Sequence, residues 1–146
     1  MTLNASTSLR RTAYVMLAAL IGFAWTVPTA SARADEVVMA PSGVTYVTGG
    51  AGTEAVDRLR AMEKDFNLKL VFARNNGEYL ADVDVSVVDG ANQVVLHTAS
   101  EGPLLLAKLP AGNYQVNANY HGSVERRAVA VGPTGLRTLD FRWPSE

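Results

Sequence analysis

Apolar and polar residues alternate with a period of two along most of the chain between residues 68 and 143. Such alternation is typical of β-strands that bury one face, and Pro and Gly interrupt the runs where a sheet needs turns. The pattern predicts seven strands, at 68–72, 83–87, 93–98, 104–108, 113–121, 124–131 and 138–143. Strands recurring at this spacing predict a mainly β fold, a seven-stranded antiparallel β-sandwich.

The clearest strand is predicted at 113–121, and its two faces differ in character. One face is apolar and is expected to lie in the core; it carries Tyr114, Val116, Ala118 and Tyr120. The other face carries a row of polar side chains: Gln115, Asn117, Asn119 and His121. Amide donors and acceptors in a row suit sugar hydroxyls or an added peptide strand, so these four residues are the candidate binding site.

The residues before 68 follow a different pattern. One amphipathic helix is predicted from Thr53 to Phe66, because Ala55, Leu59 and Phe66 fall on one stripe. Thr53 is the expected N-cap and Asn67 the expected stop. The stretch 35–52 is expected to be a flexible leader and Gly-rich loop, with one candidate strand at 44–47.

The loop before this helix also matches a nucleotide-binding pattern. Gly50-Ala51-Gly52-Thr53-Glu54-Ala55 fits the dinucleotide fingerprint G-x-G-x-x-A. However, hairpins rather than a second β-α-β unit follow, and Glu54 and Asp57 in the first turn repel phosphate. We therefore interpret the glycines as a turn and helix entry, and we expect no cofactor.

The first 34 residues have the features of a signal peptide. Arg10 and Arg11 precede an apolar run at 13–25, and Ala32-Arg33-Ala34 is a small-x-small cleavage site before Asp35. The run is shorter than the roughly 20 apolar residues that span a bilayer. We expect a periplasmic or secreted protein that starts at Asp35 and has no membrane anchor, exported by the general secretory or the twin-arginine route.

Composition narrows the classes of function. The chain has no cysteine, which excludes disulfides, thiol nucleophiles and thiolate metal sites. After cleavage, ten basic residues stand against fourteen acidic ones, a net charge of −4 without a basic cluster. We therefore expect no nucleic-acid partner. The remaining 112 or so residues suffice for one domain with one core.

A run in the middle of the predicted sandwich carries a resemblance to a known family. Ser100-Glu101-Gly102-Pro103-Leu104-Leu105-Leu106-Ala107-Lys108-Leu109-Pro110-Ala111-Gly112-Asn113-Tyr114-Gln115-Val116 resembles the signature of carboxypeptidase regulatory-like domains. The resemblance covers roughly 68–143 and implies a prealbumin-like Greek-key sandwich. It also implies an accessory, adhesive or folding role without catalytic residues. In this interpretation Tyr114 buries its ring at the corner that Pro110 and Gly112 form.

The predicted function is therefore a non-catalytic exported module for binding or structural support, with an unidentified protein or glycan as ligand. The alternative is a small periplasmic enzyme or metal-binding protein that uses His97, His121 and nearby carboxylates such as Asp82 and Asp84. The two hypotheses differ in whether these side chains converge in a concave site. We assign no catalytic, cofactor or metal residue.

Overall fold

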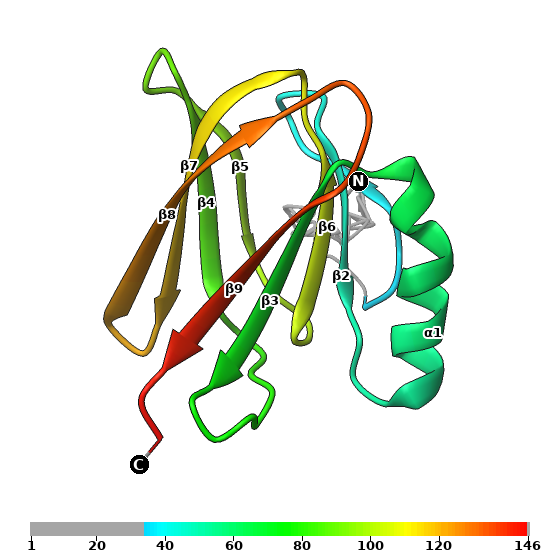
Figure 1. The fold of residues 1–146 in the computed structure, drawn as a ribbon, viewed down its shortest axis with the longest axis vertical. Coiled ribbons are helices and arrows are strands. Elements are labelled where there is room, and N and C mark those ends of the chain that lie inside the picture. The colour runs from blue at the N-terminus through cyan, green and yellow to red at the C-terminus, as the bar shows by residue number, and fades with distance from the viewer. Residues whose placement is uncertain (1–33, 146) are drawn as a thin grey trace, which may run out of the picture.

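The computed structural model describes residues 34–145 (Figure 1). These residues form one helix and nine strands. The helix, α1 (Thr53–Met62), continues into a single 3-10 turn at Glu63–Asp65. The strands are β1 (Val38–Met39), β2 (Thr45–Gly49), β3 (Leu68–Arg74), β4 (Asp84–Asp89), β5 (Val94–Ala99), β6 (Leu104–Lys108), β7 (Gly112–Tyr120), β8 (Ser123–Val131) and β9 (Arg137–Trp143).

The strands belong to two sheets. The order is β1-β2-β6-β3-β9 in the five-stranded sheet and β5-β4-β7-β8 in the four-stranded sheet. The seven strands predicted from the alternation are all present, as β3 to β9. The predicted total of seven is wrong, because β1 and β2 add two strands to the larger sheet. The wholly antiparallel arrangement is also wrong, because β9 runs parallel to β3.

The main core lies between the two sheets. The larger sheet contributes Leu68, Leu70, Phe72 and Phe141, and the smaller one contributes Val85, Val87, Val116 and Ala118, among others. These are the positions that the period-two pattern assigned to the inner face. Phe72, Phe141 and Trp143 contact one another, with ring centroids 5.8 to 6.4 Å apart.

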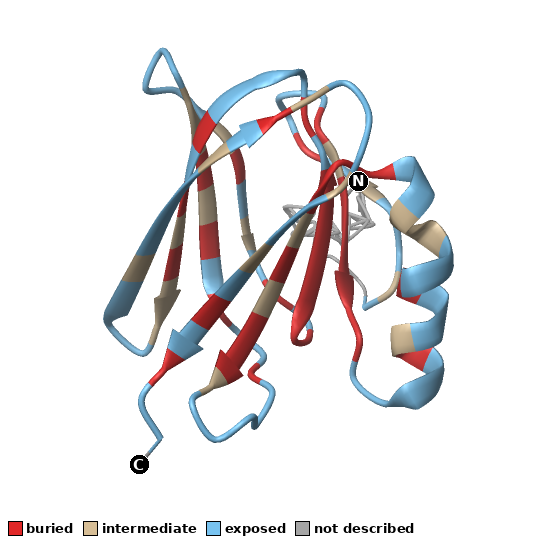
Figure 2. Ribbon diagram, viewed as in Figure 1, coloured by how far each residue is buried: buried red, intermediate tan, exposed pale blue. Residues whose placement is uncertain are grey.

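A second, smaller core lies between α1 and the opposite face of the larger sheet, here called the helix side. Leu59 and Phe66 pack there against Val47, Leu104 and Leu106. The residues Leu104 to Ala107 of β6 are consequently all buried, since both faces of this central strand are covered (Figure 2). The predicted apolar stripe is confirmed at Ala55 and Leu59, whereas Phe66 lies beyond the helix and packs on the same side of the sheet from extended backbone.

The helix begins at Thr53, as predicted, but ends at Met62 and not at Phe66, because the chain tightens into the 3-10 turn at Glu63–Asp65. Gly52 is the N-cap and makes no side-chain hydrogen bond, so the predicted capping role of Thr53 is wrong. Asn67, the predicted helix stop, lies beyond the end of the helix and has another role. It is buried, its Nδ2 donates to the carbonyl of Leu109 (2.7 Å), and its Oδ1 accepts the Leu109 N–H (2.8 Å).

The segment 35–52 is part of the sheet rather than a flexible leader. The Asp35 N–H donates to the Thr48 carbonyl (2.8 Å), and the Asp35 carboxylate accepts from Arg58 (2.8 Å) and Gly50 (3.3 Å). This carboxylate raises the pKa of the Arg58 guanidinium, because it stabilises the charged form. The signal peptide was predicted at residues 1–34, of which 1–33 lie outside the described residues. No helix at 34–145 is long and apolar enough to cross a membrane.

The corner between β6 and β7 has the geometry expected from the sequence. Leu109 and Tyr114 are both buried, and the Tyr114 hydroxyl donates to the Pro110 carbonyl (2.6 Å). Burial and then the charge of Asp89 raise the pKa of the Tyr114 phenol. The tyrosine thus fixes the connection that carries the chain from one sheet to the other.

Candidate functional site

A pocket of about 290 Å³ lies at the end of the molecule where β3, β7 and β9 finish. This end is at the bottom of Figure 1, beside the C-terminus. We call it the end pocket; it is lined by Arg74, Tyr120, His121, Ser123, Trp143, Pro144 and Ser145. The fold therefore brings together residues that are up to 71 positions apart in the chain.

Arg74, the last residue of β3, is the main charged group of the end pocket. Its side chain is only 18% exposed, and its Nη1 donates to the Pro144 carbonyl (3.4 Å). Its Nε lies 3.5 Å from the Glu78 carboxylate without a hydrogen bond, and its Cζ lies 5.7 Å from the centroid of the Tyr120 ring. Arg74 Nη2 makes no hydrogen bond to any of the described residues.

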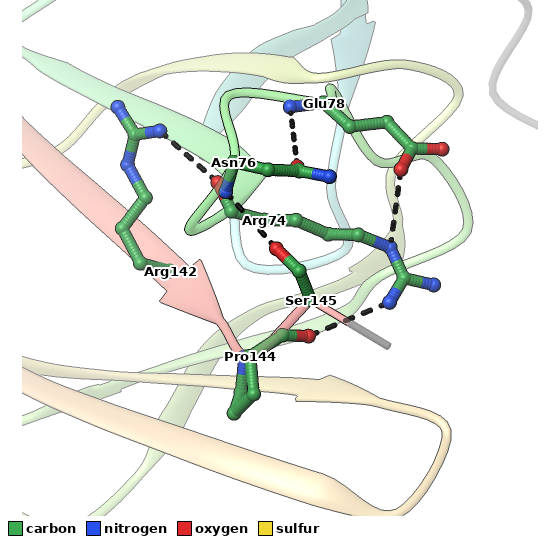
Figure 3. A network of polar contacts seen from close by, with 6 residues as sticks. All are labelled: Arg74, Asn76, Glu78, Arg142, Pro144 and Ser145. Carbon is green, nitrogen blue, oxygen red and sulfur yellow. Dashed lines mark hydrogen bonds and ion pairs between the residues drawn. The ribbon is translucent and has the colours of Figure 1, made fainter.

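The loop after β3 and the C-terminal segment hold this arginine in place (Figure 3). The Asn76 N–H donates to Ser145 Oγ (3.0 Å), and the Glu78 N–H donates to Asn76 Oδ1 (3.0 Å). Arg142, which does not line the pocket, donates from Nη1 to the carbonyl of Arg74 (3.3 Å). The two segments therefore form one polar network around the guanidinium.

Aromatic rings form the walls of the end pocket. Tyr120 stacks on His121, with centroids 4.2 Å apart and an interplanar angle of 18°. Tyr120 also contacts Trp143 at 5.8 Å. The Trp143 indole donates to the carbonyl of Ser123 (3.0 Å), which ties the end of β9 to the start of β8. A cation, hydroxyls and aromatic walls are groups that recognise polar ligands such as sugars.

His121 lies in a turn and not on the strand where it was predicted. The strand β7 ends at Tyr120, which pairs with Ser123, and both intervening residues have positive φ, 49° at His121 and 87° at Gly122. This is the two-residue turn that suits the twist of a hairpin. His121 therefore leaves the predicted polar row and contributes to the end pocket instead.

The other three residues of the predicted row occupy the outer face of the smaller sheet. Gln115 is exposed, and Asn117 and Asn119 are half-buried. Asn119 Oδ1 accepts the Gly122 N–H (2.9 Å), so this amide supports the turn. Asn117 lies opposite Ser86 and Arg126 on the neighbouring strands, and its buried Oδ1 has no hydrogen-bond partner among the described residues.

The residues of the alternative hypothesis come together only in part. His97 Nε2 lies 2.8 Å from Asp84 Oδ1 across β5 and β4, and both side chains are more than half exposed. His97 lines a hollow with Pro41 and Val94, whereas His121 lines the end pocket. At 34–145 no group of three or more His, Asp or Glu side chains is placed to hold a metal ion.

Sequence reasoning did not identify Arg74, Ser123, Trp143 or Ser145 as site residues. Arg74 lies two residues beyond the strand predicted at 68–72, and Trp143 was assigned to the core, where it indeed lies. Arg74 and Trp143 come together because β3 pairs in parallel with β9, which places the two residues opposite each other.

No protein-family model matches the chain, and a search of curated proteins finds no match.

Proposed function

We propose that this chain is an exported, non-catalytic binding module whose end pocket takes a saccharide that carries a carboxylate. The observation that carries the proposal is the Arg74 guanidinium, which is largely buried against Tyr120 and whose Nη2 donates to none of the residues 34–145. A guanidinium group can donate two parallel N–H hydrogen bonds to a carboxylate, and aromatic rings pack against the apolar faces of sugars. The hydroxyls of Ser123 and Ser145 add partners for sugar hydroxyls.

The size of the end pocket agrees with such a ligand. Its volume of about 290 Å³ suits one sugar ring of a longer chain, because the pocket is open at the end of the molecule. Among residues 34–145 no carboxylate lines the pocket, and the Glu78 carboxylate outside the lining lies 3.5 Å from Arg74 Nε. A ligand carboxylate therefore has a better partner in this pocket than a ligand cation does.

We also propose that the described residues form a prealbumin-like Greek-key sandwich of the carboxypeptidase regulatory-like type, in the periplasm or outside the cell. The two sheets with a shared core and the Tyr114 corner support this architecture. The small-x-small motif before Asp35 supports export. A binding module of this kind acts outside the cytoplasm on extracellular or envelope glycans or on glycan-bearing partners.

The alternative, a metal-dependent or hydrolytic protein, has the His97–Asp84 contact in its favour. Two side chains on an open strand face provide fewer groups than a catalytic centre or a metal ion requires. The end pocket gathers a cation, hydroxyls and aromatic rings, so binding is the function that we favour.

Isothermal titration calorimetry tests the proposal. The purified protein is titrated with galacturonic acid oligosaccharides and with neutral cello-oligosaccharides. We expect only the acidic series to bind. Arg74→Gln should weaken that binding about tenfold or more, because a hydrogen bond to a charged group is lost. The matched control Arg137→Gln, which removes an exposed arginine at the opposite end of β9 and outside the pocket lining, should leave affinity nearly unchanged.

Two results would contradict the proposal: equal affinity for the acidic and neutral series, or unchanged affinity in Arg74→Gln. Circular dichroism of both variants checks that the sheets are retained.

A further inference from the structure

A groove runs along α1 on the helix side of the larger sheet, far in sequence from the end-pocket residues of β7 to β9. We propose that this groove is a second binding site, for a small amphipathic anion such as an aromatic or short aliphatic carboxylate. It consists of an inner hollow of about 120 Å³ and an adjoining wider hollow of about 330 Å³. Val56, Arg60 and Tyr79 line both hollows, so they join into one groove.

The inner hollow combines a polar rim with an apolar floor, and four of its seven lining residues are aliphatic. Val56, Val71 and Leu104 belong to the small core between the helix and the sheet, and Pro103 continues this surface. Val56 and Val71 remain half-buried, so the helix does not cover this part of the sheet completely. An apolar group placed here would remove further surface from water, which is favourable.

The charges around the inner hollow favour an anion. Within residues 34–145, its two charged lining residues are Arg60 and Lys69, and no carboxylate lines it. Lys69 pairs with Glu63, but among the described residues no carboxylate lies within ion-pair distance of Arg60. Asp57 lines only the wider hollow. A ligand anion at the rim would therefore meet an unpaired guanidinium above an apolar surface.

Tyr79 supplies an exposed aromatic group at the same place. It is 65% exposed, although its backbone is held by an isolated bridge to Ala73 of β3. An exposed aromatic beside an arginine is a combination that recurs where proteins bind partners. The inner hollow is too small for a folded segment of another protein, which argues for a small molecule rather than a docked chain.

A pair of fluorescent probes tests the two features of the groove, its cationic rim at Arg60 and its apolar and aromatic surface. 8-Anilinonaphthalene-1-sulfonate is an aromatic anion, and N-phenyl-1-naphthylamine is its neutral counterpart. We expect the purified protein to bind the sulfonate about tenfold or more tightly than the neutral probe, as expected for an ionic hydrogen bond. Arg60→Gln should abolish this preference, and Tyr79→Ala should weaken the binding of both probes. Both residues are exposed, so the variants should fold.

Two control variants separate this site from other surfaces. Arg58→Gln removes another arginine of the same helix, which pairs with Asp35 and does not line the groove. Arg74→Gln removes the cation of the end pocket. Both controls should keep the preference for the sulfonate. The proposal is overturned if neither probe binds, if Arg60→Gln keeps the preference, or if Arg74→Gln removes it. A concentration-dependent dimer that shuts out the probes would also overturn it, since a second copy would then cover the groove.

Discussion

At the scale of single residues, tyrosine and histidine take roles that depend on their backbone positions. Tyr114 lies near the start of β7 and faces inward. Its ring is therefore buried in the core, and its hydroxyl donates a hydrogen bond to the Pro110 carbonyl. Tyr120, six positions later on the same face, ends the strand and forms a pocket wall. Its neighbour His121 has a positive φ and stacks on the Tyr120 ring. Two tyrosines on the same face of β7 therefore have different roles: Tyr114 is structural, and Tyr120 is a candidate binding residue.

The Tyr114 hydroxyl should make stability depend on pH in the alkaline range. Since the pKa of this phenol is raised by burial and by Asp89, the folded state keeps the proton better than the unfolded state does. The resulting stabilisation is present below the unfolded pKa, about 10, and is lost as pH rises through the folded pKa. Tyr114→Phe should therefore show a shallower loss of stability above pH 10 than the natural chain.

Urea denaturation between pH 8 and pH 11 measures this difference. At pH 8, Tyr114→Phe should be less stable by about 1 kcal/mol, because the hydrogen bond to the Pro110 carbonyl is lost. The other tyrosines titrate in both proteins, so the comparison isolates Tyr114. Parallel pH profiles for the two proteins would show that the phenol is not responsible.

At the scale of elements, Asn67 joins three connections of the fold. Its Nδ2 donates to the carbonyls of Leu109 (2.7 Å) and Gly132 (3.3 Å), and its backbone carbonyl accepts the N–H of Arg137 (3.0 Å). The corner after β6 and the loop before β9 are thus both attached to the start of β3. A single buried amide aligns elements of the larger sheet.

Asn67→Ala should consequently destabilise the protein by about 2–4 kcal/mol, because it leaves the buried N–H and carbonyl of Leu109 without partners. Asn76→Ala is the matched control. It removes an exposed asparagine that accepts one backbone N–H, and should cost less than about 1 kcal/mol. Urea midpoints at unchanged slope measure both values. If the two variants have the same midpoint, Asn67 does not hold these elements together.

The elements themselves could be predicted where a local pattern determines them. Alternation located β3 to β9, and the stripe containing Leu59 and Phe66 placed the helix on a sheet. The strand β1 could not be predicted, because its two residues owe their strand conformation to pairing with β2. Asn67 was identified only as a helix stop, since its partners at 109 and 132 are distant in sequence.

At the scale of the whole molecule, the candidate site depends on tertiary pairing more than on any motif. Arg74 and Trp143 lie side by side because β3 and β9 pair in parallel, a register that no local pattern encodes. The predicted row on β7 was a local inference. Of the residues in this row, His121 lies in the turn after β7 and lines the end pocket, whereas the side chain of Asn119 accepts a hydrogen bond within that turn. The end pocket and the groove beside α1 lie on different sides of the larger sheet's strands and can be tested separately.

The central claim is that the end pocket binds an acidic saccharide, and chemical-shift mapping tests it most directly. Amide and indole resonances of the nitrogen-15-labelled protein are followed while a galacturonic acid oligosaccharide is added. We predict that the largest shifts fall on Arg74, Tyr120, His121, Ser123, Ser145 and the Trp143 indole N–H. Shifts confined to Gln115 and Asn117 on the outer sheet face, or to the groove at Arg60 and Tyr79, would contradict the claim, as would the absence of any shift.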